Sequence, residues 1–437
     1  MKLLRLSIRT SMYAIAALVI ISGTSYAGDH LGLPMAKPES VGMSSERLER
    51  IASAMSSFVD DEQVPGLITV VARKGKVVHF ETYGSMDREA KKPMQADTIF
   101  RMYSMTKPVT GTAIMILYEE GKIALSDPIS KYLPEFANMK VHKGMQDGKV
   151  VTRPANKPIT IKHLLTHTSG ITYDFWPHDV GVMYKNAGLD IASAYANELN
   201  LEAYVKIIAE QPLFGQPGEV WEYGLNMDVL GRLVEVVTGQ RFGNFMEERI
   251  FEPLGMVDAG FQIADDQLER FAANYAPNPQ GGMVLVNPPQ SSLYRRDVSL
   301  HLGGAGLVCT AADYLRFAQM LANSGELEGV RILSPTTVDL MMSNHLPSVL
   351  GELPLGSLFP GVQGLGFGFC GSVVTNVASM GMAGSPGEYS WGGAASTDFW
   401  IDREQELVGM VLTQLLPAGT YPTRTRMHQM TYQAIVE

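Results

Sequence analysis

Cysteine and charge are both scarce in this chain. Its 437 residues include 2 cysteines, and charged residues make up 18% of the sequence. The cysteines, Cys309 and Cys370, could form one disulfide or remain buried thiols, because a core of this size does not need a covalent cross-link. No C-x-x-C pair or Cys/His cluster indicates a structural metal. Acidic residues outnumber basic ones, 45 to 35, and no basic run occurs. These features exclude the usual footprint of a nucleic-acid-binding protein.

Two common hydrolase signatures are also absent. Without Gly-x-Ser-x-Gly the chain lacks the nucleophile turn of α/β-hydrolases, and without His-Glu-x-x-His it lacks the common zinc-protease helix. His163 and His167 stand four residues apart, a spacing that could bind a metal. No third ligand lies nearby in the sequence, so we expect these histidines to be hydrogen-bonded in or near the core.

The first 27 residues have the three parts of a secretory signal peptide. A basic start precedes an apolar run that is too short to span a bilayer, and small residues precede a cleavage point after Ala27. An uncleaved N-terminal anchor is the alternative. The sequence therefore predicts a secreted or periplasmic protein with no stable membrane anchor after cleavage.

Strand signals at both ends of the chain enclose a helical middle. Leu67–Ala72 and Val77–Tyr83 predict a hairpin, and "STDFWID" and "LVGMVLTQ" predict a second one before a helix at Thr423–Val436. Helical periodicity marks Val109–Glu120, Ile161–Leu165, Leu201–Glu210, Met227–Thr238 and Phe245–Ile250. This order predicts an α+β fold, with a sheet domain at 28–126 and 295–437 and a mostly helical subdomain at 127–294.

The stretch "FRMYSMTKPVTG" contains the chain's Ser-x-x-Lys motif. Ser104 and Lys107 share one face at a helix start, so the hydroxyl and the amine can meet. A serine there could simply be a helix cap. A lysine in the first turn has no such explanation, because its charge opposes the helix dipole. The pair can therefore be read as a nucleophile and the amine that takes its proton.

Two further stretches could complete an active site. In "PGEVWEYGLN", Tyr223 lies in an aromatic loop and could carry a proton, while Asn226 could orient a substrate. In "EYSWGGAASTDFW", two glycines precede a strand and permit close backbone approach. The backbone N–H groups of Ala394 and Ser104 would then form an oxyanion hole. A packing tyrosine and a tight strand entry are the structural alternatives.

Taken together, the three motifs resemble the serine β-lactamase-like superfamily, which includes class C β-lactamases, D-Ala-D-Ala carboxypeptidases and family VIII carboxylesterases. "ITIKHLLTHTSGI", "FEPLGMVDAGF" and "GGAGLVCTAADYLRFAQMLANSGELEGVRILSP" also look like family segments. The resemblance implies a β-lactamase/transpeptidase-like fold with a central antiparallel sheet. It also implies that Ser104 is acylated, that Lys107 and Tyr223 activate it, and that no metal or organic cofactor is needed.

The chain departs from the lactamase pattern in two places. Tyr223-Gly-Leu-Asn226 replaces the usual Tyr-x-Asn, and Trp391-Gly392-Gly393 stands where lactamases carry Lys-Thr-Gly. Losing that lysine weakens the case for an anionic substrate, and a tryptophan favours an apolar group. We therefore expect a serine carboxylesterase acting on a small-molecule ester, with Trp391, Gly392, Gly393 and Asn226 binding it. A β-lactamase or D-amino-acid-specific peptidase or amidase, and a penicillin-binding protein with little turnover, are the alternatives.

Overall fold

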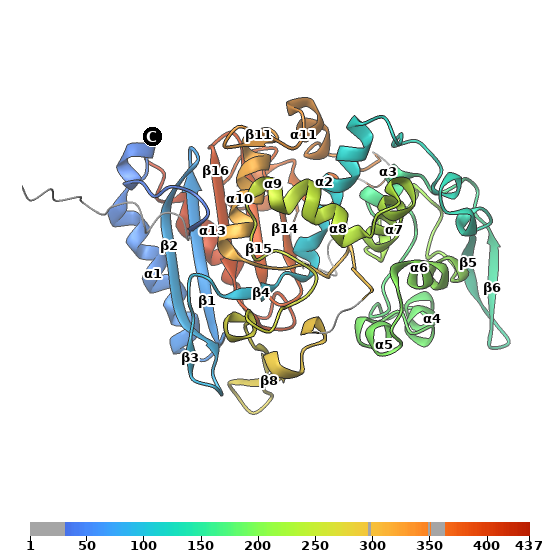
Figure 1. Cartoon of the computed structure of the whole chain (residues 1–437), viewed down its shortest axis with the longest axis horizontal. Helices are drawn as coiled ribbons and strands as arrows, with labels where there is room; N and C mark the ends of the chain where they lie inside the picture. The colour runs from blue at the N-terminus through green and yellow to red at the C-terminus, as the bar shows by residue number, and fades with distance from the viewer. Residues whose placement is uncertain (1–30, 296–298, 348–349, 351–362) are drawn as a thin grey trace, which may run out of the picture.

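The computed structural model describes residues 31–295, 299–347, 350 and 363–437, and an antiparallel sheet of 8 strands dominates it (Figure 1). In spatial order the strands are β12 (Leu365–Phe367), β13 (Ser372–Val374), β14 (Tyr389–Gly393), β15 (Thr397–Asp402), β16 (Leu407–Leu412), β1 (Gly66–Arg73), β2 (Lys76–Asp87) and β3 (Lys92–Pro93). The two predicted hairpins are β1–β2 and β15–β16. They join through β1 and β16, where Ile68 pairs with Leu412, so the sheet is built from both ends of the chain, as predicted.

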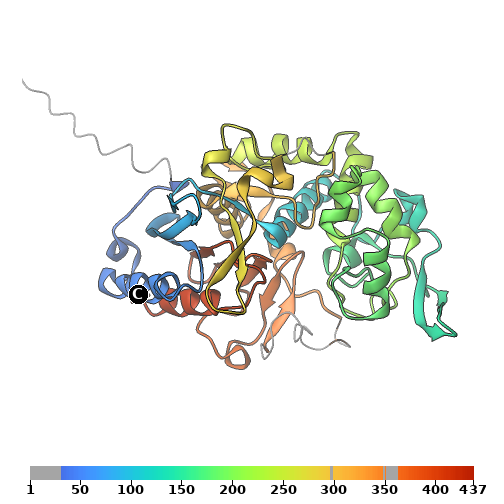
Figure 2. The ribbon, with the colours of Figure 1, turned by 90° about the horizontal axis from the view of Figure 1, so that it is seen from below.

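Helices cover both faces of this sheet. On one face α1 (Ser45–Asp60) and α13 (Thr423–Tyr432) lie side by side, as Figure 2 shows, and they enclose a core with Trp400. Ser44 precedes α1 as a typical N-cap, and its side chain accepts a hydrogen bond from the Arg47 N–H. On the other face α10 (Ala311–Ala322) packs against β15 and β16.

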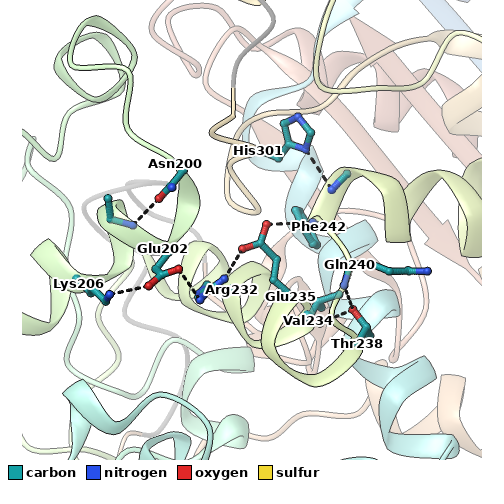
Figure 3. Close-up of polar contacts among 12 residues, drawn as sticks. Asn200, Glu202, Lys206, Arg232, Val234, Glu235, Thr238, Gln240, Phe242 and His301 are labelled. Atoms are coloured by element: carbon teal, nitrogen blue, oxygen red, sulfur yellow. Dashed lines mark hydrogen bonds and ion pairs between the residues drawn. The ribbon is translucent and has the colours of Figure 1, made fainter.

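The helical part of the chain lies to the right in Figure 1. It contains α3 (Ile161–Leu165), α4 (Asp179–Asn186), α5 (Ile191–Ala196), α6 (Leu201–Glu210), α7 (Asn226–Thr238) and α8 (Phe242–Met246). The short α9 (Glu252–Leu254) lies nearer the centre of the view. Figure 3 shows polar contacts that join α6, α7 and α8. Arg232 on α7 donates to Glu202 and to Glu235, both at 2.9 Å, and Glu235 also accepts the Phe242 N–H at 3.1 Å.

α2 (Thr106–Glu119) connects the two parts. Its residues from Thr106 to Leu117 are all buried, and it contacts α7 and α8 of the helical part and α11 (Pro335–Met341). A helix buried all round is a core helix. The first residues of α2 are therefore held from several sides.

Smaller strand pairs complete the fold. They are β4 (Ile99–Arg101) with β9 (Val308–Thr310), β5 (Lys140–Gln146) with β6 (Lys149–Pro154), β7 (Asn274–Pro277) with β8 (Met283–Asn287), and β10 (Glu326–Leu327) with β11 (Val330–Arg331). Ala273 and Tyr275 donate their N–H groups to Met86 and Gln414, so this segment lies against the sheet. The subdomain boundaries at residues 126 and 294 stay a prediction.

Both cysteines are free and fully buried, which confirms the buried-thiol alternative for Cys309 and Cys370. Burial raises the pKa of the Cys309 thiol well above its ordinary value, so it stays protonated. Among the residues that the structure describes, every helix is too short or too polar to cross a bilayer. The predicted signal peptide, residues 1–27, lies outside the described residues.

Candidate active site

Ser104 and Lys107 meet at the start of α2. Ser104 lies in a 3-10 turn, Tyr103–Met105, that runs directly into the helix. The helix N-cap is Met105, with no side-chain cap bond, so Ser104 does not serve as a cap. Its Oγ lies 3.0 Å from Lys107 Nζ, a hydrogen bond between the proposed nucleophile and base. Tyr103 has φ +45°, a strained conformation of the kind that gathers at functional sites.

Lys107 is fully buried and has two more partners besides Ser104. Its Nζ lies 3.0 Å from Tyr173 Oη and 2.8 Å from the Gly304 carbonyl oxygen. The carbonyl can only accept, whereas the two hydroxyls can donate or accept. The amine can therefore donate to Gly304 and still take a proton from Ser104.

Sequence reasoning missed Tyr173, which lies far from Ser104 along the chain. Its hydroxyl, not that of Tyr223, is the phenol that bonds Lys107. Burial, reinforced by Tyr223, holds the pKa of Tyr173 well above its ordinary value, so Tyr173 is a neutral phenol. The aromatic run "TYDFW" after "THTSGI" is the same kind of signal as the Tyr223 loop, and it could have marked Tyr173.

A buried carboxyl group, also missed from the sequence, lies behind the lysine. Asp228 on α7 accepts the Gly304 N–H at 3.1 Å, and the Gly304 carbonyl in turn contacts Lys107. Burial raises the pKa of Asp228 to about 6, against the opposing effects of the Gly304 hydrogen bond and of Lys107. Asp228 thus holds the residue whose carbonyl oxygen accepts a hydrogen bond from the amine.

Tyr223 lies beside this cluster. The Nζ atom of Lys107 sits 4.6 Å from the centre of the Tyr223 ring. The Tyr223 hydroxyl accepts a hydrogen bond from Trp391 Nε1 at 3.3 Å. The structure therefore brings Tyr223 and Trp391 together with Ser104 and Lys107, as the sequence suggested, but it gives the direct bond to Lys107 to Tyr173.

The two glycines of β14 let that strand approach the nucleophile closely. A Cβ atom on Gly393 would lie 2.4 Å from the Met102 carbonyl oxygen and 2.2 Å from Thr397 Oγ1, so only glycine fits. Met102 directly precedes the turn that carries Ser104. Ala394, the first residue after β14, lines the same cavity as Ser104, where the oxyanion hole was expected.

A cavity of about 910 Å³ opens over Ser104. Its apolar wall includes Tyr173, Phe175, Ile191, Tyr223, Trp391, Leu416, Pro417 and Tyr421. Gly392 and Gly393 also line it, so three of the four expected binding residues face the cavity. A mostly apolar cavity with a few polar groups is typical of a small-molecule site.

Asn226 is the exception and corrects one expectation. It is fully buried and absent from the cavity wall, and its Nδ2 lies 2.8 Å from His167 Nδ1 while its Oδ1 accepts from Ser169. His167 Nδ1 also accepts the Gly224 N–H. The structure thus gives Asn226 internal partners in place of a substrate contact, because the amide is used to hold the Tyr223 loop.

The paired histidines have structural partners, as expected from the sequence. His163 accepts the Thr160 N–H at 3.2 Å and donates its own N–H to Thr160, which caps α3. Burial, aided by Lys107, holds the pKa of His167 well below its ordinary value, so its ring is neutral.

Comparison with known proteins assigns the chain to a family. The family model described as "Beta-lactamase" matches residues 51–430. The chain belongs to the Beta-lactamase family. It is 35% identical over 379 residues to Protein Rv1367c of Mycobacterium tuberculosis (strain ATCC 25618 / H37Rv), a match that covers 84% of this chain and 89% of that protein. It is 30% identical over 386 residues to Esterase EstB of Burkholderia gladioli, with 85% and 91% covered.

A solved structure of the same family agrees with the fold. EstCE1, described as "a hydrolase with promiscuous acyltransferase activity", superposes with a TM-score of 0.70 at 26% identity, covering 89% of this chain and 99% of that one. The predicted β-lactamase/transpeptidase-like α+β fold is thereby confirmed. Within this family the chain is a serine hydrolase, with Ser104 and Lys107 as the candidate reacting pair.

Proposed function

We propose that this protein is a carboxylesterase that hydrolyses neutral small-molecule esters through an acyl-enzyme on Ser104. The single observation that carries the proposal is the 3.0 Å hydrogen bond between the buried Lys107 Nζ and the Oγ of Ser104, which lines an apolar cavity. A serine in contact with a positioned amine is an activated nucleophile. Relatives named esterase or hydrolase support the same reaction class.

Acylation begins when Ser104 Oγ attacks the ester carbonyl carbon. The hydroxyl proton passes to Lys107 Nζ, and the carbonyl oxygen becomes an oxyanion facing the N–H groups of Ser104 and Ala394. Collapse of this intermediate breaks the bond to the alcohol. The proton returns through a phenol, Tyr173 or Tyr223, to the departing alkoxide. The products of this half are a free alcohol and an ester on Ser104.

Deacylation repeats the same steps with water. Lys107 takes a proton from the water, the hydroxide attacks the acyl carbon, and Ser104 leaves with that proton restored. The Gly304 carbonyl, held by Asp228, keeps the amine in place throughout both halves. The free acid then departs and the site returns to its starting state.

The cavity wall favours uncharged, apolar substrates. Trp391 stands at the position where a lactamase-like lysine would meet a carboxylate, and it donates to Tyr223. An aromatic side chain there binds apolar acyl or alcohol groups by burying their surface. A β-lactam carboxylate finds no lysine at this position, so we expect β-lactams to be turned over more slowly than simple esters.

A second candidate function is acyl transfer to an alcohol other than water. A cavity of about 910 Å³ is large enough to hold an acyl group and a bulky alcohol together. If an alcohol enters the acyl-enzyme before water, the same residues return an ester instead of an acid. The relative EstCE1 is described as having this promiscuous activity.

One comparison tests the proposal. Purified protein is given p-nitrophenyl esters of short and long chain and, separately, a chromogenic cephalosporin. We expect ester turnover that Ser104→Ala abolishes, while the matched control Ser53→Ala, an exposed serine on α1, keeps it. Mass spectrometry of a quenched reaction is expected to find the acyl mass on Ser104. Ester turnover that survives Ser104→Ala would overturn the mechanism, and fast cephalosporin turnover with negligible ester turnover would overturn the substrate class.

A further inference from the structure

One side of the active-site cavity holds an ion pair that the ester chemistry does not use. Asp398 on β15 and Arg424 in the first turn of α13 both line this cavity. Arg424 Nη1 lies 3.4 Å from Asp398 Oδ1, and Arg424 Nη2 donates to Ser390 Oγ at 2.7 Å. The Asp398 side chain is only 11% exposed and the Arg424 side chain 25% exposed. A largely buried ion pair therefore forms part of the wall of an apolar cavity.

The carboxyl group of Asp398 is fixed against the glycine pair of β14. Asp398 and Gly392 are directly opposite each other in the β14–β15 ladder. A Cβ atom on Gly392 would lie 2.2 Å from Asp398 Oδ1, so the carboxyl group fills the space that a side chain at position 392 would need. Any larger residue there would expel it. The glycine at 392 and the acid at 398 thus form one structural unit next to Trp391.

Arg424 in this wall would otherwise attract anions. A guanidinium group presents several donors in a fork that matches a carboxylate. Here a carboxylate of the protein itself already sits beside it. A substrate carboxylate entering this side of the cavity would have to lie next to Asp398, and two like charges in a poorly solvated site repel strongly. The pair therefore disfavours anionic substrates and tolerates neutral ones.

We infer that Asp398 is a specificity-determining residue whose carboxylate occupies Arg424 and so restricts the cavity to esters with uncharged acyl and alcohol parts. The inference deepens the proposed esterase function and rests on it. Burial raises the pKa of Asp398 to about 7, partly opposed by Arg424, so the carboxyl group is mostly ionised at pH 8. That pH is therefore the one at which the restriction is tested.

The experiment compares two esters of equal acyl chain length at pH 8. These are p-nitrophenyl hexanoate, which is neutral, and mono-p-nitrophenyl adipate, which ends in a carboxylate. The readout is the ratio of kcat/KM for the adipate to kcat/KM for the hexanoate. We expect Asp398→Asn to raise this ratio at least about tenfold, since each tenfold step needs only a modest change in interaction energy. Adding Arg424→Gln to that variant is expected to abolish the gain.

Controls separate charge selection from general damage. Asp339→Asn makes the same chemical change in an exposed Asp–Arg pair with Arg403, and its ratio should match the wild type. A folded Asp398→Asn variant whose ratio stays within twofold of wild type would overturn the inference. If Asp398→Asn does not fold, Asp398→Ser is assayed in its place, because it also removes the carboxylate and leaves Arg424, and an unchanged ratio in that folded variant refutes the idea. Absence of hexanoate turnover in the wild type would refute the esterase function itself.

Discussion

Replacing Gly393 by alanine tests the geometry of the expected oxyanion hole. The new methyl group would start 2.4 Å from the Met102 carbonyl oxygen and 2.2 Å from Thr397 Oγ1. Carbon–oxygen contacts in proteins are normally about 3.3 Å or longer, so β14 must move away by about 1 Å. The neighbouring N–H of Ala394 moves with it. Misplacement by about 1 Å can cost 10²-fold in rate, and loss of one oxyanion donor costs about 10²–10³.

We therefore expect Gly393→Ala to lower kcat for p-nitrophenyl butyrate by about 10²-fold. The fold should survive, because overpacking of this kind costs about 1–3 kcal/mol. Steady-state kinetics and thermal unfolding measure the two effects separately. Gly260→Ala is the matched control, since a Cβ there meets no atom closer than 3.7 Å. A folded Gly393→Ala enzyme with kcat within threefold of wild type would refute the assignment of this strand edge to the oxyanion.

Three other outcomes follow from the site. Tyr173→Phe removes a hydrogen bond to Lys107 and is expected to lower kcat at least as much as Tyr223→Phe does. A larger loss of the single-turnover acylation rate in Tyr223→Phe than in Tyr173→Phe would favour Tyr223 as the proton carrier. Asp228→Asn should be more stable than wild type above pH 6, by up to about 3 kcal/mol. The fold raises the pKa of Asp228 from 3.8 to about 6, so the wild type is most stable below pH 3.8 and loses that stability as pH rises through 6. The amide of the variant stays neutral and loses nothing over this range. Urea unfolding at pH 4 and pH 8 measures that difference, which should shrink at the lower pH. Asn226→Ala takes the acceptor from the buried Ser169 hydroxyl, while His167 Nδ1 keeps the Gly224 N–H, so the variant should lose about 1–3 kcal/mol of stability, measured by the same unfolding.

Local patterns in the sequence predicted much of the fold. The β-branched and apolar residues of Leu67–Ala72 and of "STDFWID" marked real strands, and the periodicity of Leu201–Glu210 marked α6 to the residue. These segments carry their signal within a few neighbours, through side-chain spacing and turn residues. The pairing of β1 with β16 was anticipated only in outline, because nothing local sets the register of strands so far apart.

In the candidate site, too, the local contact could be predicted from the sequence and the long-range contacts could not. Ser104 and Lys107 lie one turn apart, so their contact follows from helix geometry. Tyr173 and Asp228 reach the lysine only through tertiary folding, and a single sequence does not state which distant side chains converge. Asn226 illustrates the opposite error, because a polar residue beside a motif looked like a ligand-binding group. Its burial, which depends on the whole fold, gives it His167 as a partner instead.

The pairing of β1 with β16 also ties the active site to the C-terminal strands of the chain. During synthesis β1 emerges early, and one of its edges stays open until the last strands of the chain arrive. β14, which closes over the nucleophile, is anchored through β15 and β16 to that same edge. A nascent or C-terminally truncated chain therefore carries Ser104 without the strand beside it. The strand beside Ser104 is therefore in place only when the C-terminal strands β14–β16 have paired with β1.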